Sequence, residues 1–171
     1  MYYSEYYKFD TQNGEGVRCT LFISGCSRCC PDCFNKQTWD YKYGKEYTQE
    51  FEDSLIKDLA NHYVAGLSLL GGNPTERKNI SQVIKLCQRV RKELPDKDIW
   101  IWSGHTFEQL KENLLQSQLL ELVDVLVDSK FEKEYYDPNL LFRGSKNQRI
   151  IDVQQSLLTN QIILWNNGEY I

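Results

Sequence analysis

The sequence predicts a single α/β domain built on parallel strands, and three observations support this fold class. Apolar, strand-like segments alternate with amphipathic helical segments along the 171 residues, as they do in βαβ crossover units. The length suits one domain with a sizeable core, and no repeat or linker divides it. The segments rich in glycine, cysteine and polar residues follow predicted strands, at the edge where parallel α/β proteins bind ligands. We therefore expect one domain over residues 1–171.

The predicted strands are short, apolar and rich in β-branched residues, and they cover residues 17–24, 66–70, 98–103 and 122–127. Gly25 ends the first strand, and the breaker cluster Gly71-Gly72-Asn73-Pro74 ends the second. An irregular loop is expected over residues 130–146. Terminal strands are expected at 150–153 and 162–165, the latter within a C-terminal extension over about residues 155–171.

Three helices are predicted between these strands. The first covers residues 48–63, with Thr48 as its N-cap and acidic residues in its first turn. The second covers residues 80–94 and ends before a proline. The third begins at Thr106, which forms a capping box with Gln109.

Composition excludes several classes of function. The 20 basic and 24 acidic residues give a net charge of −4, which offers no electrostatic case for binding nucleic acid. No apolar run approaches the roughly 18 residues that span a bilayer, and no secretory signal pattern begins the chain. We therefore expect a cytoplasmic protein, in which clustered cysteines are metal ligands or redox groups more often than disulfides.

Cys26, Cys30 and Cys33 form a C-x3-C-x2-C triplet directly after the first predicted strand. Three thiolates can hold three irons of a [4Fe-4S] cluster and leave the fourth iron without a protein ligand. An open coordination position is typical of a reactive metal site, because a closed site cannot bind a substrate. The loop 26–33 is therefore predicted to hold a reactive cluster.

Other interpretations of the cysteines remain open at this point. Cys26 with Cys29, and Cys30 with Cys33, form two abutting C-x2-C pairs, which would suggest structural zinc or a thioredoxin-like dithiol. Adjacent side chains diverge in most backbone conformations, however, and zinc sites usually separate their pairs by a dozen or more residues. Cys29 is therefore interpreted as a spectator. The two remaining cysteines, Cys19 and Cys87, are expected to be buried as small apolar residues.

Beyond the triplet, several segments resemble those of a known enzyme superfamily. They are residues 13–26, 33–39, 67–74, 98–104, 125–131 and 142–149. With the cysteine loop after the first strand and Gly71-Gly72-Asn73-Pro74 after the second, the chain resembles the radical S-adenosylmethionine (SAM) superfamily. Within it, the chain is most similar to the activating proteins of anaerobic (class III) ribonucleoside-triphosphate reductase. The similarity covers about residues 5–155.

The resemblance implies a partial (β/α) barrel of parallel strands and a radical SAM glycyl-radical activating enzyme. In such enzymes a reduced [4Fe-4S] cluster cleaves SAM, and the resulting 5′-deoxyadenosyl radical takes a hydrogen from a glycine of the partner reductase. The implied partners are the large subunit of the reductase and an electron donor such as flavodoxin. A chain this small has little room to enclose a metabolite, whereas a protein substrate needs only an open edge.

The resemblance also implies roles for individual residues. Cys26, Cys30 and Cys33 would bind the cluster. Backbone groups of Asp32, Cys33 and Phe34 would contact the adenine of SAM, the alternative for Phe34 being packing in the core.

Gly71 and Gly72 lack Cβ atoms and would let backbone carbonyls approach the methionyl ammonium; the alternative is an ordinary strand-to-helix turn. Asn73 stands where the superfamily more often has an acidic residue, so if carbonyl groups do the binding, Asn73→Asp should leave activity intact or raise it. Ser103 is a weaker candidate for the same site. Asp128 would bind a monovalent cation near SAM or orient Lys130, the alternative being a cap for a helix or loop.

Expectations also follow for the histidines, for one basic segment and for alternative functions. His62 and His105 match no ligand spacing and are expected to be surface or internally satisfied histidines. The basic segment 143–149 would either face the reductase or be a solvated loop. The alternative functions are a radical SAM enzyme acting on a small molecule and a non-catalytic zinc or iron–sulfur binding module.

Overall fold

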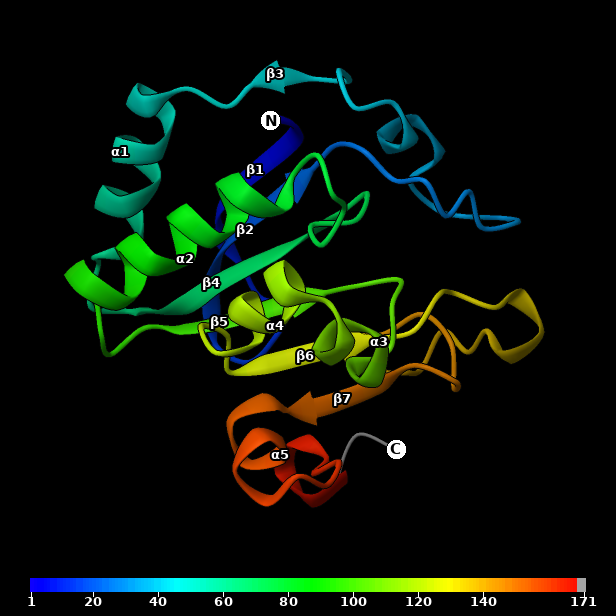
Figure 1. Cartoon of the computed structure of the whole chain (residues 1–171). Coiled ribbons are helices and arrows are strands. Elements are labelled where there is room, and N and C mark those ends of the chain that lie inside the picture. The colour runs from blue at the N-terminus through cyan, green and yellow to red at the C-terminus, as the bar shows by residue number, and fades with distance from the viewer. Residues whose placement is uncertain (169–171) are drawn as a thin grey trace.

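A computed structural model describes residues 1–168 as an α/β domain built around one seven-stranded sheet (Figure 1). The strand order is β3-β1-β2-β4-β5-β6-β7. The strands are β1 (Tyr2–Asp10), β2 (Val17–Ile23), β3 (Lys45–Glu46), β4 (Val64–Gly71), β5 (Asp98–Trp102), β6 (Val125–Asp128) and β7 (Arg149–Asp152).

Only the centre of the sheet is parallel. Strands β2, β4, β5 and β6 pair in parallel, whereas β1 and β7 pair antiparallel with their neighbours. The short segment between β1 and β2 permits an antiparallel pair, while each parallel pair needs a helical crossover. The expectation of parallel strands is thus correct for the four strands that carry the candidate site and wrong for the flanking strands. The sheet is open among the described residues, and no barrel is formed.

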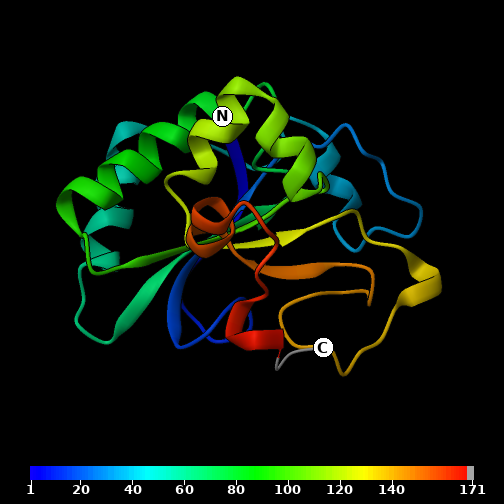
Figure 2. The same cartoon turned by 60° about the horizontal axis from the view of Figure 1, so that its bottom comes forward.

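Helices connect the parallel strands and cover one face of the sheet (Figure 2). The helices are α1 (Gln49–Leu59), α2 (Ile80–Glu93), α3 (Phe107–Glu112), α4 (Leu114–Leu120) and α5 (Val153–Thr159), with 3-10 turns η1 (Lys36–Trp39), η2 (Lys133–Tyr135) and η3 (Trp165–Gly168). Thr48 caps α1, and Thr106 and Gln109 form the capping box of α3, as predicted.

The two faces of the sheet bury different side chains, because successive residues of a strand point to opposite sides. Ile99 and Ile101 of β5 belong to the main core beneath the helices. Trp100 belongs to a second cluster on the other face, where Phe142 and Trp165 pack against it. Cys19 and Cys87 are fully buried in the main core, as expected.

Arg18 fixes the amino-terminal ends of the parallel strands. Its side chain is fully buried, donates through Nε to Ser68 Oγ over 2.7 Å, pairs with Asp98 and lies 5.3 Å from the centre of the Trp100 ring. A buried cation is tolerated only when it is paired and hydrogen-bonded. Arg18 therefore joins β2, β4 and β5 at the end of the sheet opposite the cysteines.

The C-terminal extension contains α5 and η3, whereas the strand expected at 162–165 is a single antiparallel bridge between Ile151 and Leu164. Residues 169–171 of the extension lie outside the described part of the chain. Within residues 1–168, no helix has the length and apolar character needed to cross a membrane.

Candidate functional site

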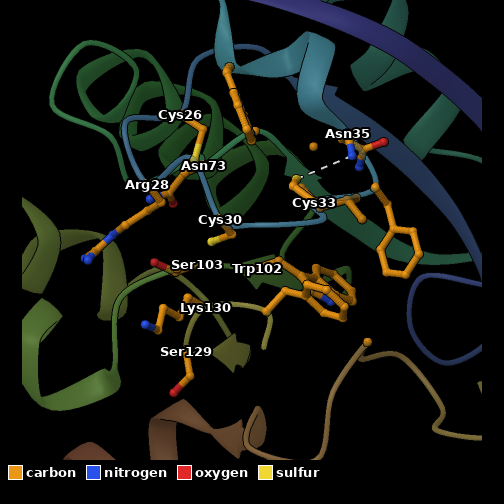
Figure 3. A pocket seen from close by; sticks show the side chains of 18 of the residues that line it. Cys26, Arg28, Cys30, Cys33, Asn35, Asn73, Trp102, Ser103, Ser129 and Lys130 are labelled. Atoms are coloured by element: carbon orange, nitrogen blue, oxygen red, sulfur yellow. Dashed lines mark hydrogen bonds between the residues drawn. The ribbon is translucent and has the colours of Figure 1, made fainter. Parts of the chain in front are cut away.

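A cavity opens at the carboxyl edge of the parallel strands (Figure 3). Its wall is formed by the segments that follow β2, β4, β5 and β6, including Cys26, Cys30, Cys33, Gly71, Gly72, Asn73, Ser103, Lys130 and Phe131. The structure thus brings together the cysteine loop and the segments after the next three strands. Of the predicted site residues, Asp32 and Asp128 are not part of this wall.

A tight turn brings Cys30 and Cys33 close to each other. The Cys33 N–H donates to the Cys30 carbonyl over 3.2 Å, and Asp32 has a φ of 58°. Proline at the second position and a left-handed residue at the third are typical of a type II turn, and Asp tolerates that conformation better than most residues. The sequence Cys30-Pro31-Asp32-Cys33 therefore encodes its own loop geometry.

Cys29 does not share the cavity with the other three cysteines of the loop. It has a φ of 45°, is exposed and does not line the cavity, whereas Cys26, Cys30 and Cys33 do. Three thiols around one cavity, with the fourth outside, match the donor set of a three-cysteine [4Fe-4S] site. Among the described residues, no three His, Cys, Asp or Glu side chains converge closely enough to hold a single metal ion.

The thiols differ in their electrostatic surroundings. Burial raises the pKa of Cys26, and the Glu76 carboxylate raises it further. Burial and the neighbouring Cys33 raise the pKa of Cys30, while Lys130 and Arg28 oppose that shift. The Asn35 N–H lies 3.4 Å from Cys33 Sγ (Figure 3). The site is therefore more negative near Cys26 and more positive near Cys30.

Gly71 and Gly72 are needed because two backbone segments approach each other here. Gly71 has a φ of 108°, and a Cβ on Gly72 would lie 2.7 Å from the Gly25 carbonyl oxygen. The Gly72 and Asn73 N–H groups donate to Ile23 O and Gly25 O over 2.7 and 2.9 Å. The glycines thus hold the start of the cysteine loop against the end of β4.

The Asn73 side chain is buried in the turn that follows these glycines. Its Oδ1 accepts from Thr75 Oγ1 over 2.8 Å, and its Nδ2 lies 3.4 Å from Glu76 Oε1 and 3.5 Å from His105 Nδ1. These contacts make Asn73 part of the framework of the turn.

Known proteins resemble the chain over most of its length. The family model described as "4Fe-4S single cluster domain" matches residues 12–151. The anaerobic ribonucleoside-triphosphate reductase-activating protein of Vibrio cholerae is 50% identical over 152 residues, 88% of this chain and 97% of that protein. The proteins of the same name from Escherichia coli K12 and Enterobacteria phage T4 are 46% and 38% identical, over 86% and 88% of this chain and 96% and 93% of their own lengths. The chain belongs to this family of activating proteins.

Glu76 is a buried residue in contact with the cysteine loop that the sequence pattern did not reveal. It is only 8% exposed and accepts hydrogen bonds from Ser27, in the cysteine loop, and from Tyr41. Burial alone would raise the pKa of Glu76, but the hydrogen bonds from Ser27, Tyr41 and Asn73 hold it below its ordinary value. Glu76 lies in a short turn, where sequence periodicity does not predict burial. Only the high cost of burying a charge without partners could have indicated a structural role, and that signal appears only once the burial is known.

Asp128 is fully buried and directly precedes Ser129, which lines the cavity. Its Oδ2 accepts from the Phe107 N–H over 2.9 Å, at the start of α3, and both of its oxygens contact the Arg149 guanidinium. Arg149 also pairs with Glu108 at 2.8 Å, and its hydrogen bonds lower the pKa of Glu108 to about 2. These contacts are those of the cap named as the alternative for Asp128.

Phe34 does not pack in the core. It is 66% exposed, and its ring lies 5.1 Å from that of Phe131 and 5.7 Å from that of Tyr136. Nearby, Asp32 pairs with Lys133 at 3.2 Å across exposed surface. The cysteine loop and the segment 130–146, an irregular loop as predicted, thus meet at an aromatic rim, which we define as Phe34, Phe131 and Tyr136.

Ser103 and His105 belong to the same polar network as Asn73. Ser103 is 4% exposed, and its Oγ lies 2.7 Å from Thr75 Oγ1 and accepts from the His105 N–H over 3.1 Å. Burial and the nearby Arg28 lower the pKa of His105. His105 is therefore a half-buried, internally satisfied histidine beside the cavity.

Proposed function

We propose that this chain activates an anaerobic ribonucleoside-triphosphate reductase by generating a radical from SAM at a [4Fe-4S] cluster. The observation that carries the proposal is the cavity at the carboxyl edge of the parallel strands, with Cys26, Cys30 and Cys33 in its wall and Cys29 outside. Relatives of nearly the same length are named activating proteins of the anaerobic reductase, which supports this part of the proposal.

In this proposal Cys26, Cys30 and Cys33 hold the cluster and leave one iron open to SAM. When bound, the reduced cluster would supply the one electron needed to split SAM into methionine and a 5′-deoxyadenosyl radical, and that radical would take a hydrogen atom from a glycine Cα of the reductase. The type II turn of the loop sets the spacing of Cys30 and Cys33. The framework around Asn73 fixes the part of the wall that follows β4.

The cavity offers complementary charges for the methionyl group of SAM. Lys130 and Arg28 line the wall near Cys30 and suit a carboxylate. Carbonyl groups of Gly71 and Gly72, with Asn73 and Ser103 beside them, would face the ammonium group. Backbone groups of Asp32, Cys33 and Phe34 would contact the adenine. The contacts of Asp128 favour the cap over a monovalent-cation site, because both of its oxygens already accept hydrogen bonds.

The remaining parts of the proposal concern partners and location. The aromatic rim and the open cavity suit a protein substrate that inserts a loop. A low-potential donor such as flavodoxin would deliver the electron, and the net charge of −4 argues against nucleic acid as a partner. We place the chain in the cytoplasm, as one radical SAM domain over residues 1–171 with no membrane partner.

The proposal is tested by mixing the anaerobically reconstituted chain with SAM, a reductant and the reductase, and recording the glycyl radical by paramagnetic resonance. Cys30→Ala should abolish both 5′-deoxyadenosine formation and the glycyl radical, whereas the neighbouring Cys29→Ala should retain both. Cleavage of SAM without a glycyl radical would indicate a small-molecule substrate. Metal analysis that finds zinc in place of about four irons per chain would exclude a radical SAM activity.

A further inference from the structure

The buried carboxylate of Glu76 takes no part in the activity proposed above, yet it joins three segments at the cluster loop. Glu76 lies in the turn before α2, at the carboxyl edge of the sheet. Its Oε1 accepts from the Ser27 N–H over 3.1 Å and from Ser27 Oγ over 2.9 Å. Its Oε2 accepts from the Tyr41 hydroxyl over 2.9 Å. Oε1 is thus directed at the cysteine loop itself, and Oε2 is directed at Tyr41, which lies outside the loop.

Both hydrogen-bond partners bear directly on Cys26. Ser27 follows Cys26 in the chain, so the two bonds to Ser27 fix the backbone beside that thiol. Tyr41 packs against Gly25, which precedes Cys26, so closely that a Cβ on Gly25 would lie 2.2 Å from the tyrosine ring. Glu76 therefore holds the residues on either side of Cys26.

The Glu76 side chain also brings a negative charge to this side of the site. Its hydrogen bonds outweigh the effect of burial and hold its pKa below the ordinary value, so it is ionised at neutral pH. Three cations are also near the site: Arg28 and Lys130 act on Cys30, and Lys78 Nζ lies 4.6 Å from the centre of the Tyr41 ring. Because Glu76 is buried, solvent screens its charge less than it screens an exposed one.

We propose that Glu76 is a positioning residue that orients the Cys26 arm of the loop, and that its buried charge lowers the reduction potential of the bound [4Fe-4S] cluster. The inference rests on the cluster site of the proposed function. A fixed negative charge disfavours the added electron, and net charge is among the factors that set iron–sulfur potentials. A lower potential makes the reduced cluster a stronger reductant.

The test is a redox titration of the reconstituted full chain, followed by the paramagnetic signal of the reduced cluster. Glu76→Gln keeps the shape of the side chain and removes its charge. We expect the ratio of reduced to oxidised cluster at a given applied potential to rise about tenfold. For a one-electron couple this is a positive shift of about 59 mV in the midpoint potential. The iron content should remain about four per chain.

Two matched variants separate the charge from the hydrogen bonds. Ser27→Ala and Tyr41→Phe each remove one bond to Glu76 and leave its charge in place, so both should keep the wild-type potential. Glu76→Asp keeps the charge with a shorter side chain and should also stay near the wild-type value. If Glu76→Gln does not assemble a cluster, a Glu76→Asp potential displaced from the wild-type value is the outcome that overturns the inference.

An unchanged potential in Glu76→Gln would overturn the inference. So would an equal shift in Ser27→Ala and Tyr41→Phe, or a Glu76→Asp potential moved as far as predicted for Glu76→Gln. None of these titrations needs SAM or the reductase. A wild-type chain that fails to activate the reductase would therefore contradict the proposed function and leave this comparison of potentials valid.

Discussion

Single residues in the cysteine loop are constrained by backbone conformation as much as by chemistry. Gly25 has a φ of 108° and lies against the Tyr41 ring, while Cys29 and Asp32 adopt left-handed conformations without being glycine. Such conformations persist only where surrounding contacts hold them. The start of the loop is therefore shaped by its neighbours, whereas the turn from Cys30 to Cys33 follows from its own sequence.

Gly25→Ala should displace Tyr41, because the new Cβ would lie 2.2 Å from Tyr41 Cδ1 and the φ of 108° is strained for alanine. We expect the free energy of unfolding to fall by about 2–3 kcal/mol and the iron bound per chain to fall with it. Denaturant unfolding and iron analysis measure the two effects.

Gly104→Ala is the matched control for this variant, since its Cβ would meet only the flexible Arg28 side chain, at 3.1 Å. Its stability should stay within about 1 kcal/mol of wild type. Equal losses in the two variants would contradict the argument from Gly25.

The structure predicts a loss of stability for Asn73→Asp, whereas the sequence suggested only that activity would be kept or raised. The amide Nδ2 lies 3.4 Å from Glu76 Oε1, so an aspartate would place two carboxylates against each other in a buried turn. We expect a loss of about 1–2 kcal/mol in unfolding free energy. Urea unfolding measures this loss, and adding Glu76→Gln should recover most of it through a double-mutant cycle. Wild-type stability of the single variant would show that the turn tolerates a second carboxylate.

At the scale of elements, the segments that form the site are fixed by caps and pairs that lie outside the cavity. Asp128, at the end of β6, accepts from the first N–H of α3 and pairs with Arg149 of β7. One buried side chain thus joins two strands and a helix. This arrangement positions Ser129 and Lys130, which do line the cavity.

Asp128→Asn should destabilise the chain by about 3 kcal/mol, because it leaves Arg149 without its buried partner and weakens the cap of α3. Glu108→Gln removes the more exposed partner of the same arginine and should cost less than about 1 kcal/mol. Thermal unfolding of the two variants provides the comparison. A larger loss in Glu108→Gln would show that the exposed pair dominates.

At the scale of the whole molecule, the core does not depend on the cysteine loop. The main core is made of residues from the central strands and the covering helices, and Cys26, Cys30 and Cys33 are outside it. In this respect the chain differs from a zinc finger, whose fold requires its metal.

Removing iron with a chelator should therefore leave the chain folded. We expect the far-ultraviolet circular dichroism of the iron-free chain to match that of the loaded chain, and its thermal unfolding to remain cooperative. Loss of the cooperative transition on iron removal would show that the cluster is part of the core.

The sequence predicted the central strands because residues 17–23 and 98–102 are apolar runs bounded by clear breakers, and the caps Thr48 and Thr106 marked two helices. It missed β1, where tyrosines are mixed with charged residues and no regular apolar alternation marks a strand. It also missed α4, which is only seven residues long.

The candidate site was likewise predicted in part. The cysteine spacing and the glycine cluster identified its wall, because each is a local pattern. Glu76 and the pairing of Asp128 with Arg149 escaped notice, because their partners are distant in sequence: Tyr41 lies 35 positions from Glu76, and Arg149 lies 21 from Asp128. Interactions of this kind are specified by the fold and have no signature in a short window.

The incomplete pairing of β1 has a consequence for solubility. Within the described chain, β3 pairs with β1 only at Tyr2 and Tyr3, so the outer edge of β1 beyond them has no strand beside it. Exposed strand edges can recruit a second copy into a shared sheet and so start aggregation. Glu5, Lys8 and Asp10 place charges of both signs along this stretch, and burying them against another strand would be unfavourable. The charges that made β1 hard to recognise in the sequence thus protect the folded chain from self-association.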